Sequence, residues 1–208
     1  MSRLVLVATR LESAQLPTLA QASRVVVCGL GPVAAALGAA AALAERPASE
    51  VLLVGLAGSR DLERAPLGAL ALGSEAWNEC VGVGHGREFL DLQGMGLADE
   101  PLPADVYPLQ QPPCFDDLPA WPLGTVAAAS ASAQEAAARG ARRPQVLLEE
   151  MEAWGVAQAC ERAGVPLAVL RAVSNAVGDR DHASWAFDAA FAALDAGLAR
   201  WLAAEPRA

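Results

Sequence analysis

The run Leu167-Ala168-Val169-Leu170-Arg171-Ala172-Val173-Ser174-Asn175 is apolar except for one arginine and a polar pair at its end. Its length and its aliphatic content predict a buried strand. Similar runs occupy residues 4–7, 25–28 and 51–56, and alanine-rich helical stretches lie between them. Strands that alternate with helices in this way are typical of an α/β domain built on a mostly parallel sheet.

Three helices are expected from their end signals. Pro32 suits the first turn of a helix that runs to about residue 46, because its missing N–H is not needed there. A second helix is expected to begin near Glu152 and to stop at Gly164. The third, over about 184–203, carries aromatic and aliphatic residues at near-helical spacing. We expect these to lie in the core or at a subunit interface.

The middle of the chain has a different character. Residues 67–83 are expected to be extended, and the segment at about 85–122 is rich in proline, which predicts a loop-dominated insert. The insert could cap a site, reach a neighbouring subunit or be a surface excursion. With 208 residues the chain is long enough for one core, so we expect a single domain over 1–208.

Composition excludes several classes of partner. The net charge is -9, which disfavours nucleic acid because phosphate contacts require clustered cations. The four cysteines show no paired spacing and no nearby histidine, so neither a metal site nor a disulfide scaffold is expected. The apolar tract over 33–44 is shorter than the roughly 20 residues that span a bilayer. We expect a cytoplasmic protein that does not enter a membrane.

Polar groups stand at the ends of these apolar elements. Glu150-Met151-Glu152 opens the expected second helix, Ser174-Asn175 ends the last strand, and Glu12 follows the first strand. An unpartnered buried polar group costs about 1–3 kcal/mol, so such placement indicates contact with a ligand. Glu12 could orient or deprotonate a water there, although an acid that stabilises a helix N-terminus is the simpler interpretation.

The glycines of Gly29-Leu30-Gly31-Pro32-Val33-Ala34 follow a strand and open a helix, as in dinucleotide-binding folds. That fold also needs an acid at the end of the next strand, to hold the ribose hydroxyls. Residues 51–56 run instead into Gly55-Leu56-Ala57-Gly58. We therefore expect no nicotinamide or flavin cofactor, and no other cofactor is indicated.

Four segments together resemble a known family. They are Val26-Val27-Cys28-Gly29-Leu30-Gly31, Leu53-Val54-Gly55-Leu56-Ala57-Gly58, Glu150-Met151-Glu152-Ala153 and Val169-Leu170-Arg171-Ala172-Val173-Ser174-Asn175. Their order and spacing resemble the purine nucleoside phosphorylase and hydrolase superfamily, over nearly the whole chain. The resemblance implies a single-domain, three-layer sandwich around a mixed, mostly parallel sheet. The tail from Ser174 to Asp181, with Trp185 after it, is most similar to the futalosine hydrolases of the nucleosidase branch.

The resemblance also implies roles for individual residues. Glu12 would position the attacking water, Glu152 would bind the ribose 2′- and 3′-hydroxyls, and Met151 would pack under the sugar. Arg171 would brace the site, and Asn175 would contact the departing purine. Gly58 and Ser174 complete the substrate-binding set that we expect.

Asn175 stands where adenine-specific nucleosidases have aspartate. An amide donates to a 6-oxo group that a carboxylate would repel, so a 6-oxopurine nucleoside is the expected substrate. The resemblance implies hydrolysis of futalosine to hypoxanthine and dehypoxanthine futalosine in menaquinone biosynthesis. Leu56 replaces the serine or threonine that often follows this glycine, which favours water over phosphate as the acceptor.

Several alternatives stay open at this point. The chain could be a methylthioadenosine or adenosylhomocysteine nucleosidase, a 6-oxopurine nucleoside phosphorylase, or an inactive purine-binding protein. The group that binds the 5′ substituent, a carboxylated aromatic acyl chain in futalosine, has no candidate beyond an arginine or backbone donors. Trp154 departs from the small residue usual in the family, and no residue of 130–134 can be chosen against the purine. The resemblance implies a homodimer or a higher homo-oligomer.

Overall fold

The computed structural model describes residues 2–96 and 100–205. The strands are β1 Ser2–Val7, β2 Val25–Val27, β3 Ala48–Ser59, β4 Leu70–Asn78, β5 Val106–Pro108, β6 Ala120–Thr125, β7 Leu148–Glu150 and β8 Leu167–Ala176. The α-helices are α1 Arg10–Ala14, α2 Pro32–Glu45, α3 Ala133–Arg142, α4 Ala153–Ala163 and α5 Phe187–Ala203. Short 3₁₀ turns are η1 Pro17–Gln21, η2 Gly86–Glu88, η3 Pro113–Phe115 and η4 His182–Ser184.

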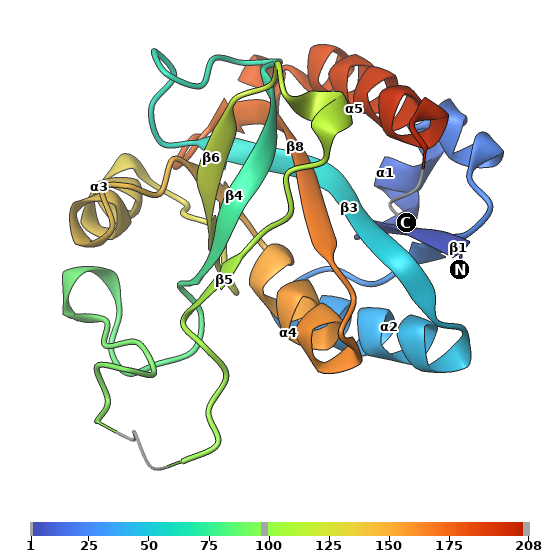
Figure 1. The fold of residues 1–208 in the computed structure, drawn as a ribbon. Helices are drawn as coiled ribbons and strands as arrows, with labels where there is room; N and C mark the ends of the chain where they lie inside the picture. Colours follow the sequence, from blue (N-terminus) through green and yellow to red (C-terminus); the bar gives the residue numbers. More distant parts are fainter. Residues whose placement is uncertain (1, 97–99, 206–208) are drawn as a thin grey trace.

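Strand β8 lies at the centre of the sheet (Figure 1). It pairs in parallel with β3 along nearly its whole length and antiparallel with the start of β4. Strands β1 and β2 extend the sheet beyond β3 in parallel. On the other side β6 pairs in parallel with β4 and β7, and β7 returns antiparallel to the end of β3. The expected mixed and mostly parallel sheet is confirmed.

Two apolar layers enclose the sheet because alternate residues of each strand point to opposite faces. On β8, Val169 and Val173 pack with α2 and α4, whereas Leu170 and Ala172 pack with α5 and η1. Figure 1 shows α2 and α4 on one face and α5 on the other. The three-layer arrangement is therefore confirmed, and it leaves the carboxyl ends of the parallel strands free to carry a site.

The expected helices are confirmed with small shifts at their ends. Helix α4 ends at Ala163 and is capped by Gly164, whose φ of 65° is the left-handed conformation that glycine adopts at helix ends. Helix α5 begins at Phe187 rather than 184, because Asp181 caps the separate turn η4. Helix α3 and the short strands β6 and β7 were not located from the sequence. Strand β5 lies within the proline-rich segment and pairs with β4.

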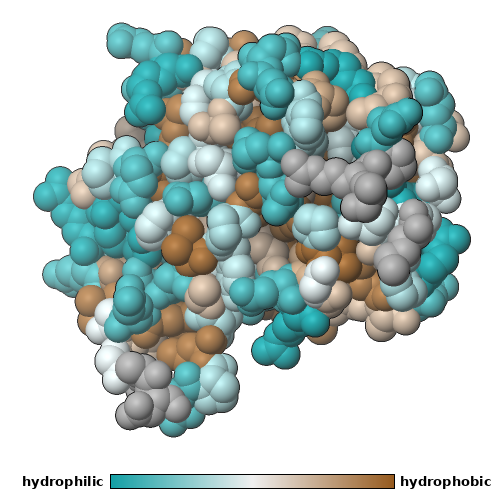
Figure 2. Space-filling model, in the orientation of Figure 1, coloured by the Kyte–Doolittle hydropathy of each residue, from teal (hydrophilic) through white to brown (hydrophobic). Residues whose placement is uncertain are grey.

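Exposed apolar side chains gather on the projecting part of the chain that follows β4, at the lower left of Figure 2. Val81, Val83 and Leu90 of this part are exposed. Within residues 2–96 and 100–205, no helix has both the length and the apolar character that crossing a bilayer requires.

Candidate active site

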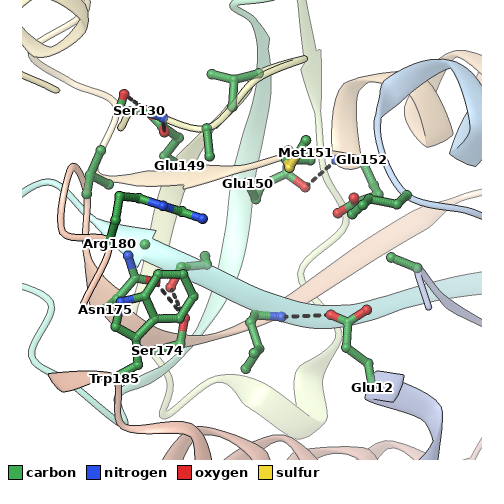
Figure 3. A pocket seen from close by; sticks show the side chains of 18 of the residues that line it. Glu12, Ser130, Glu149, Glu150, Met151, Glu152, Ser174, Asn175, Arg180 and Trp185 are labelled. Atoms are coloured by element: carbon green, nitrogen blue, oxygen red, sulfur yellow. Dashed lines mark hydrogen bonds between the residues drawn. The ribbon is translucent and has the colours of Figure 1, made fainter. Parts of the chain in front are cut away.

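A cavity of about 300 Å³ opens at the carboxyl ends of β1, β3 and β8 (Figure 3). This is where ligands bind in sheets of this kind. Predicted site residues from four parts of the chain line the cavity: Glu12, Gly58, Met151, Glu152, Ser174 and Asn175. The sequence therefore predicted the meeting of these segments correctly. Arg171 does not line the cavity and lies behind its wall, fully buried.

Arg171 holds two carboxylates in place. Its Nη2 donates to Glu150, and to Oε2 of Glu152 at 3.1 Å. Glu150 also accepts from the backbone N–H groups of Glu152 and Ala153, at 3.0 and 2.8 Å. These N–H groups belong to the start of α4, where a carboxylate stabilises the helix dipole. Glu150, whose side chain is fully buried, thus fixes the entry of α4 and has a structural place in the site.

Gly55 of β3 pairs directly with Arg171 of β8. A Cβ atom at Gly55 would lie 2.2 Å from Nη1 of Arg171 and 3.1 Å from Oε1 of Glu12. A side chain of any size would therefore push the guanidinium out of its position. Glycine is required here because the arginine crosses the strand at this point.

Glu152 is held from two sides. Its Oε1 accepts from the backbone N–H of Gly31 at 3.1 Å, at the N-terminus of α2, and its Oε2 accepts from Arg171. The glycine loop before α2 thus presents a backbone donor to a carboxylate of the chain itself. Burial raises the pKa of the Glu152 carboxyl to about 7, against the lowering effect of Arg171 and with a further rise from Glu150.

Glu12 caps α1 and also lies at the cavity. Its Oε2 accepts from the backbone N–H of Thr9 at 3.1 Å and from the Thr9 hydroxyl at 2.8 Å, which completes a capping box for α1. Its Oε1 faces the cavity side and accepts a long hydrogen bond of 3.4 Å from Leu56 N–H. One carboxylate oxygen therefore anchors the residue while the other retains accepting capacity.

Ser174 and Asn175 line the side of the cavity that faces Glu12 (Figure 3). The Ser174 hydroxyl donates to Oδ1 of Asn175 at 2.8 Å, and Nδ2 of Asn175 donates to the backbone carbonyl of Ala176 at 2.8 Å. These two bonds fix the orientation of the amide. One N–H of Nδ2 and one lone pair of Oδ1 remain for a ligand.

The sequence did not assign a role to four residues that also line the cavity: Ser130, Glu149, Arg180 and Trp185. Glu149 accepts from the backbone N–H of Ser130 at 2.7 Å and from its hydroxyl at 2.9 Å. Arg60 and Arg139 lie 3.3 and 3.4 Å from the same carboxylate. Through these contacts Glu149 connects the loop before α3 to strand β7. The feature of the sequence that could have indicated a role for Glu149 is the pair of adjacent acids, Glu149 and Glu150, before Met151.

The site geometry can be compared with known proteins. The family model described as the phosphorylase superfamily matches residues 18–202. The chain belongs to the phosphorylase superfamily. The match begins after β1 and α1. It confirms the superfamily that the four sequence segments predicted.

Curated relatives narrow the assignment within the superfamily. A futalosine hydrolase of Streptomyces coelicolor is 37% identical over 81% of this chain and 74% of its own length. A futalosine hydrolase of Thermus thermophilus is 35% identical over 85% of this chain and 80% of its own. The chain groups with the futalosine hydrolases of the phosphorylase superfamily.

Solved structures of the superfamily share the fold. Futalosine hydrolase of Helicobacter pylori superposes with a TM-score of 0.76 at 16% identity, over 95% of both chains. A mutant nucleosidase from the same organism, with 5′-methylthioadenosine in its active site, gives 0.78 at 16% identity over 97% of both. At such identity the likeness concerns the fold alone.

Proposed function

We propose that this protein hydrolyses the N-glycosidic bond of a 6-oxopurine nucleoside, with futalosine as the substrate and hypoxanthine as the released base. The observation that carries the proposal is the placement of Glu12 and Glu152 on one side of a single cavity and Asn175 on the other. The curated futalosine hydrolases of 33–37% identity support the choice of substrate. The reaction would then belong to menaquinone biosynthesis.

Cleavage of a glycosidic bond passes through an oxocarbenium-like transition state in which positive charge develops on the sugar. Glu152, beneath the ribose, would accept from its 2′- and 3′-hydroxyls and stabilise that charge. Asn175 would donate its free N–H to the purine as electrons move onto the base. Glu12 would orient a water toward C1′ and take its proton, while the purine nitrogen leaves with a proton from solvent.

Water rather than phosphate fits the wall around Glu12. The neighbouring residue is Leu56, which offers no hydroxyl, and Arg171 behind it is already paired with two carboxylates. A phosphate dianion next to Glu12 would meet repulsion, and among the described residues no free cation lies beside Glu12 in the cavity lining. This favours hydrolysis over phosphorolysis.

The deciding experiment incubates the purified protein with futalosine, inosine and methylthioadenosine, each with and without phosphate, and identifies the released base. We expect hypoxanthine from futalosine at the same rate with and without phosphate. Base release only in the presence of phosphate would establish a phosphorylase. Adenine release from methylthioadenosine in preference to futalosine would establish the adenine nucleosidase alternative.

Replacing Asn175 by aspartate is expected to shift preference toward an adenine nucleoside. The new oxygen would face either the 6-oxo group or the Ala176 carbonyl that Nδ2 contacts at 2.8 Å. We expect kcat/KM for futalosine to fall by about 100-fold, because a buried donor is replaced by an acceptor. The ratio of methylthioadenosine to futalosine turnover is the measurement, with thermal unfolding as a check on folding. An unchanged ratio would contradict the assignment of Asn175 to the base.

Activity and stability are expected to depend on pH in opposite directions. Glu152 accepts from both ribose hydroxyls and stabilises the positive charge on the sugar best when it is ionised, so kcat/KM should rise with pH and level off above about 7, the pKa of its carboxyl. That pKa lies above the 4.5 of an unperturbed glutamate. The protonated form therefore stabilises the fold below pH 4.5, and this contribution is lost as pH rises through 7.

The measurements are a pH–rate profile and unfolding curves over a pH range that includes the pKa of Glu152 in the unfolded chain, 4.5, and in the folded protein, about 7. Glu152→Gln should lose the acidic limb of the rate profile together with the corresponding slope of the stability curve. A profile that keeps its limb in this variant would assign the titration to another group.

We further propose that the enzyme is a homo-oligomer of the cytoplasm. Leu30, Val33 and Leu37 are 61%, 71% and 67% exposed. Leu30 lines the cavity and precedes α2, and the other two lie on α2. Exposed large apolar side chains that lie close together mark association surfaces, and these three lie within eight residues of one another in the sequence. The four cysteines are free thiols, which suits a reducing compartment. Light scattering of the purified protein would measure the oligomeric state.

A further inference from the structure

We propose that Arg180 recognises a carboxylate on the 5′ substituent of the nucleoside, and that the Trp185 ring supplies the surface on which this substituent lies. The inference rests on the proposed function and assigns the part of the substrate that Glu152 and Asn175 leave uncovered. It makes Arg180 a specificity-determining residue that lies apart from the reacting bond.

The charge of the cavity is the first argument. Four carboxylates line it, those of Glu12, Glu149, Glu150 and Glu152, and Arg180 is the one basic residue among its described lining. The chain as a whole carries a net charge of -9. Arginines outside this lining already pair with three of these carboxylates, Arg60 and Arg139 with Glu149, and Arg171 with Glu150 and Glu152. Arg180 is therefore the basic residue of the described lining that remains to attract an anionic substrate. Neutral parts of a nucleoside need no such counter-charge, since amides and hydroxyls suffice for them.

The availability of the guanidinium is the second argument. Within residues 2–96 and 100–205, Arg180 forms no ion pair and its side chain donates no hydrogen bond, whereas Arg171 is paired with two carboxylates. The acids beside Arg180 are engaged in their own loop. Asp179 accepts from the Ser184 hydroxyl, and Asp181 accepts from the backbone N–H of Ala183 at 3.0 Å. The planar fork of Arg180 is thus free to bind a carboxylate in bidentate fashion.

The indole ring of Trp185 lies beside the Arg180 guanidinium at the cavity. The guanidinium carbon of Arg180 lies 5.2 Å from the indole centroid. Figure 3 shows the side chain reaching into the cavity between Glu149 and Asn175, beside the indole. The Trp185 ring is supported by His182 and Phe187, at centroid distances of 4.6 and 5.3 Å. Its Nε1 is buried without a hydrogen-bond partner among the described residues, so it can donate to a carbonyl of the ligand.

The exposure of Arg180 is the third argument. Base and ribose are assigned to the buried groups of Asn175 and Glu152, and we place the 5′ substituent at the exposed rim of the same cavity, where Arg180 lies. The loop that carries Arg180 has a fixed start at Gly178, whose φ is 89°. A Cβ atom there would lie 2.6 Å from the carbonyl oxygen of Ser132, so the loop packs directly on the chain entering α3.

The test compares three substrates that differ in one feature at a time: futalosine, its carboxamide, in which a neutral amide replaces the carboxylate, and inosine, which lacks the substituent. For Arg180→Gln we expect kcat/KM for futalosine to fall about 10- to 100-fold, mainly through KM, because one charge-assisted bidentate contact is lost. Turnover of the carboxamide and of inosine should change little. Arg180→Lys should retain part of the preference, since it keeps the charge and loses the fork.

Added salt supplies an independent readout. The KM of the wild-type protein for futalosine should rise with ionic strength, and this dependence should be lost in Arg180→Gln. Arg162→Gln, at the exposed end of α4, is the matched control and should keep wild-type preference and salt dependence.

Two results would be decisive against the inference. Equal losses on all three substrates would assign Arg180 to the base or to the loop structure and overturn its role at the carboxylate. A wild-type protein that cleaves futalosine and its carboxamide equally well would do the same. Failure of the wild-type protein to release hypoxanthine from futalosine would overturn the proposed function itself, and the wild-type assay shows this before any variant is made.

Discussion

Glu12→Gln is expected to lower kcat for futalosine by about 10²- to 10⁴-fold, the range that a positioned general base contributes. The amide cannot take a proton from water, yet its carbonyl oxygen can still accept from Thr9, because glutamine also completes a capping box. The fold and the affinity for the nucleoside should therefore be kept. Single-turnover kinetics and equilibrium binding of a non-hydrolysed analogue separate the two effects.

Glu135→Gln is the matched control for this experiment. Glu135 occupies the same position in α3 that Glu12 occupies in α1, three residues after a capping side chain, and it does not line the cavity. It should leave turnover unchanged. Turnover by Glu12→Gln that stays near the wild-type value would remove Glu12 from the mechanism.

Arg171→Met is expected to lower the free energy of unfolding by about 3–5 kcal/mol, the usual cost of removing one partner of a buried ion pair. Glu150 and Glu152 would then lose the arginine with which both carboxylates are paired. Urea unfolding at mildly alkaline pH measures the loss. Lowering the pH should recover part of it, because protonation of Glu152 removes one of the unpaired charges, and the loss of Arg171 raises the pKa of Glu152 above its wild-type value of about 7.

The control for this variant is Arg162→Met, which removes an exposed arginine from the last turn of α4 and should cost at most about 1 kcal/mol. The double variant Arg171→Met with Glu152→Gln should be less destabilised than the two single changes predict by addition. Additive losses would mean that Arg171 and Glu152 are not coupled.

The sequence predicted the parts of the fold that depend on local pattern. The apolar residues of 167–175 indicated a strand with two buried faces, and Gly164 marked the end of α4. Strands β5, β6 and β7 escaped detection because they have three to six residues and depend on pairing with distant partners rather than on their own composition.

The candidate site was predicted through its motif residues, and it was incomplete where function depends on contacts across the chain. The acids at 150 and 152 look alike in sequence and both line the cavity, yet the Glu150 carboxylate is occupied by the start of α4 and by Thr125, whereas Glu152 is held by Gly31 and Arg171. The sequence placed Arg180 only within the segment from Ser174 to Asp181 and gave it no role. Its freedom from ion pairs depends on how Asp179 and Asp181 are engaged, which a sequence does not show.

The hydrogen bond between Gly31 and Glu152 has a consequence for assembly. It joins the carboxylate proposed for the ribose to the start of α2, the helix on which Val33 and Leu37 are exposed and at which we propose that a second copy binds. A neighbour that fixes this helix also fixes the donor that orients Glu152, and a bound nucleoside acts on the helix in return. Thermodynamic linkage makes this reciprocal. Substrate should therefore tighten self-association, and dilution of the protein should weaken its affinity for substrate.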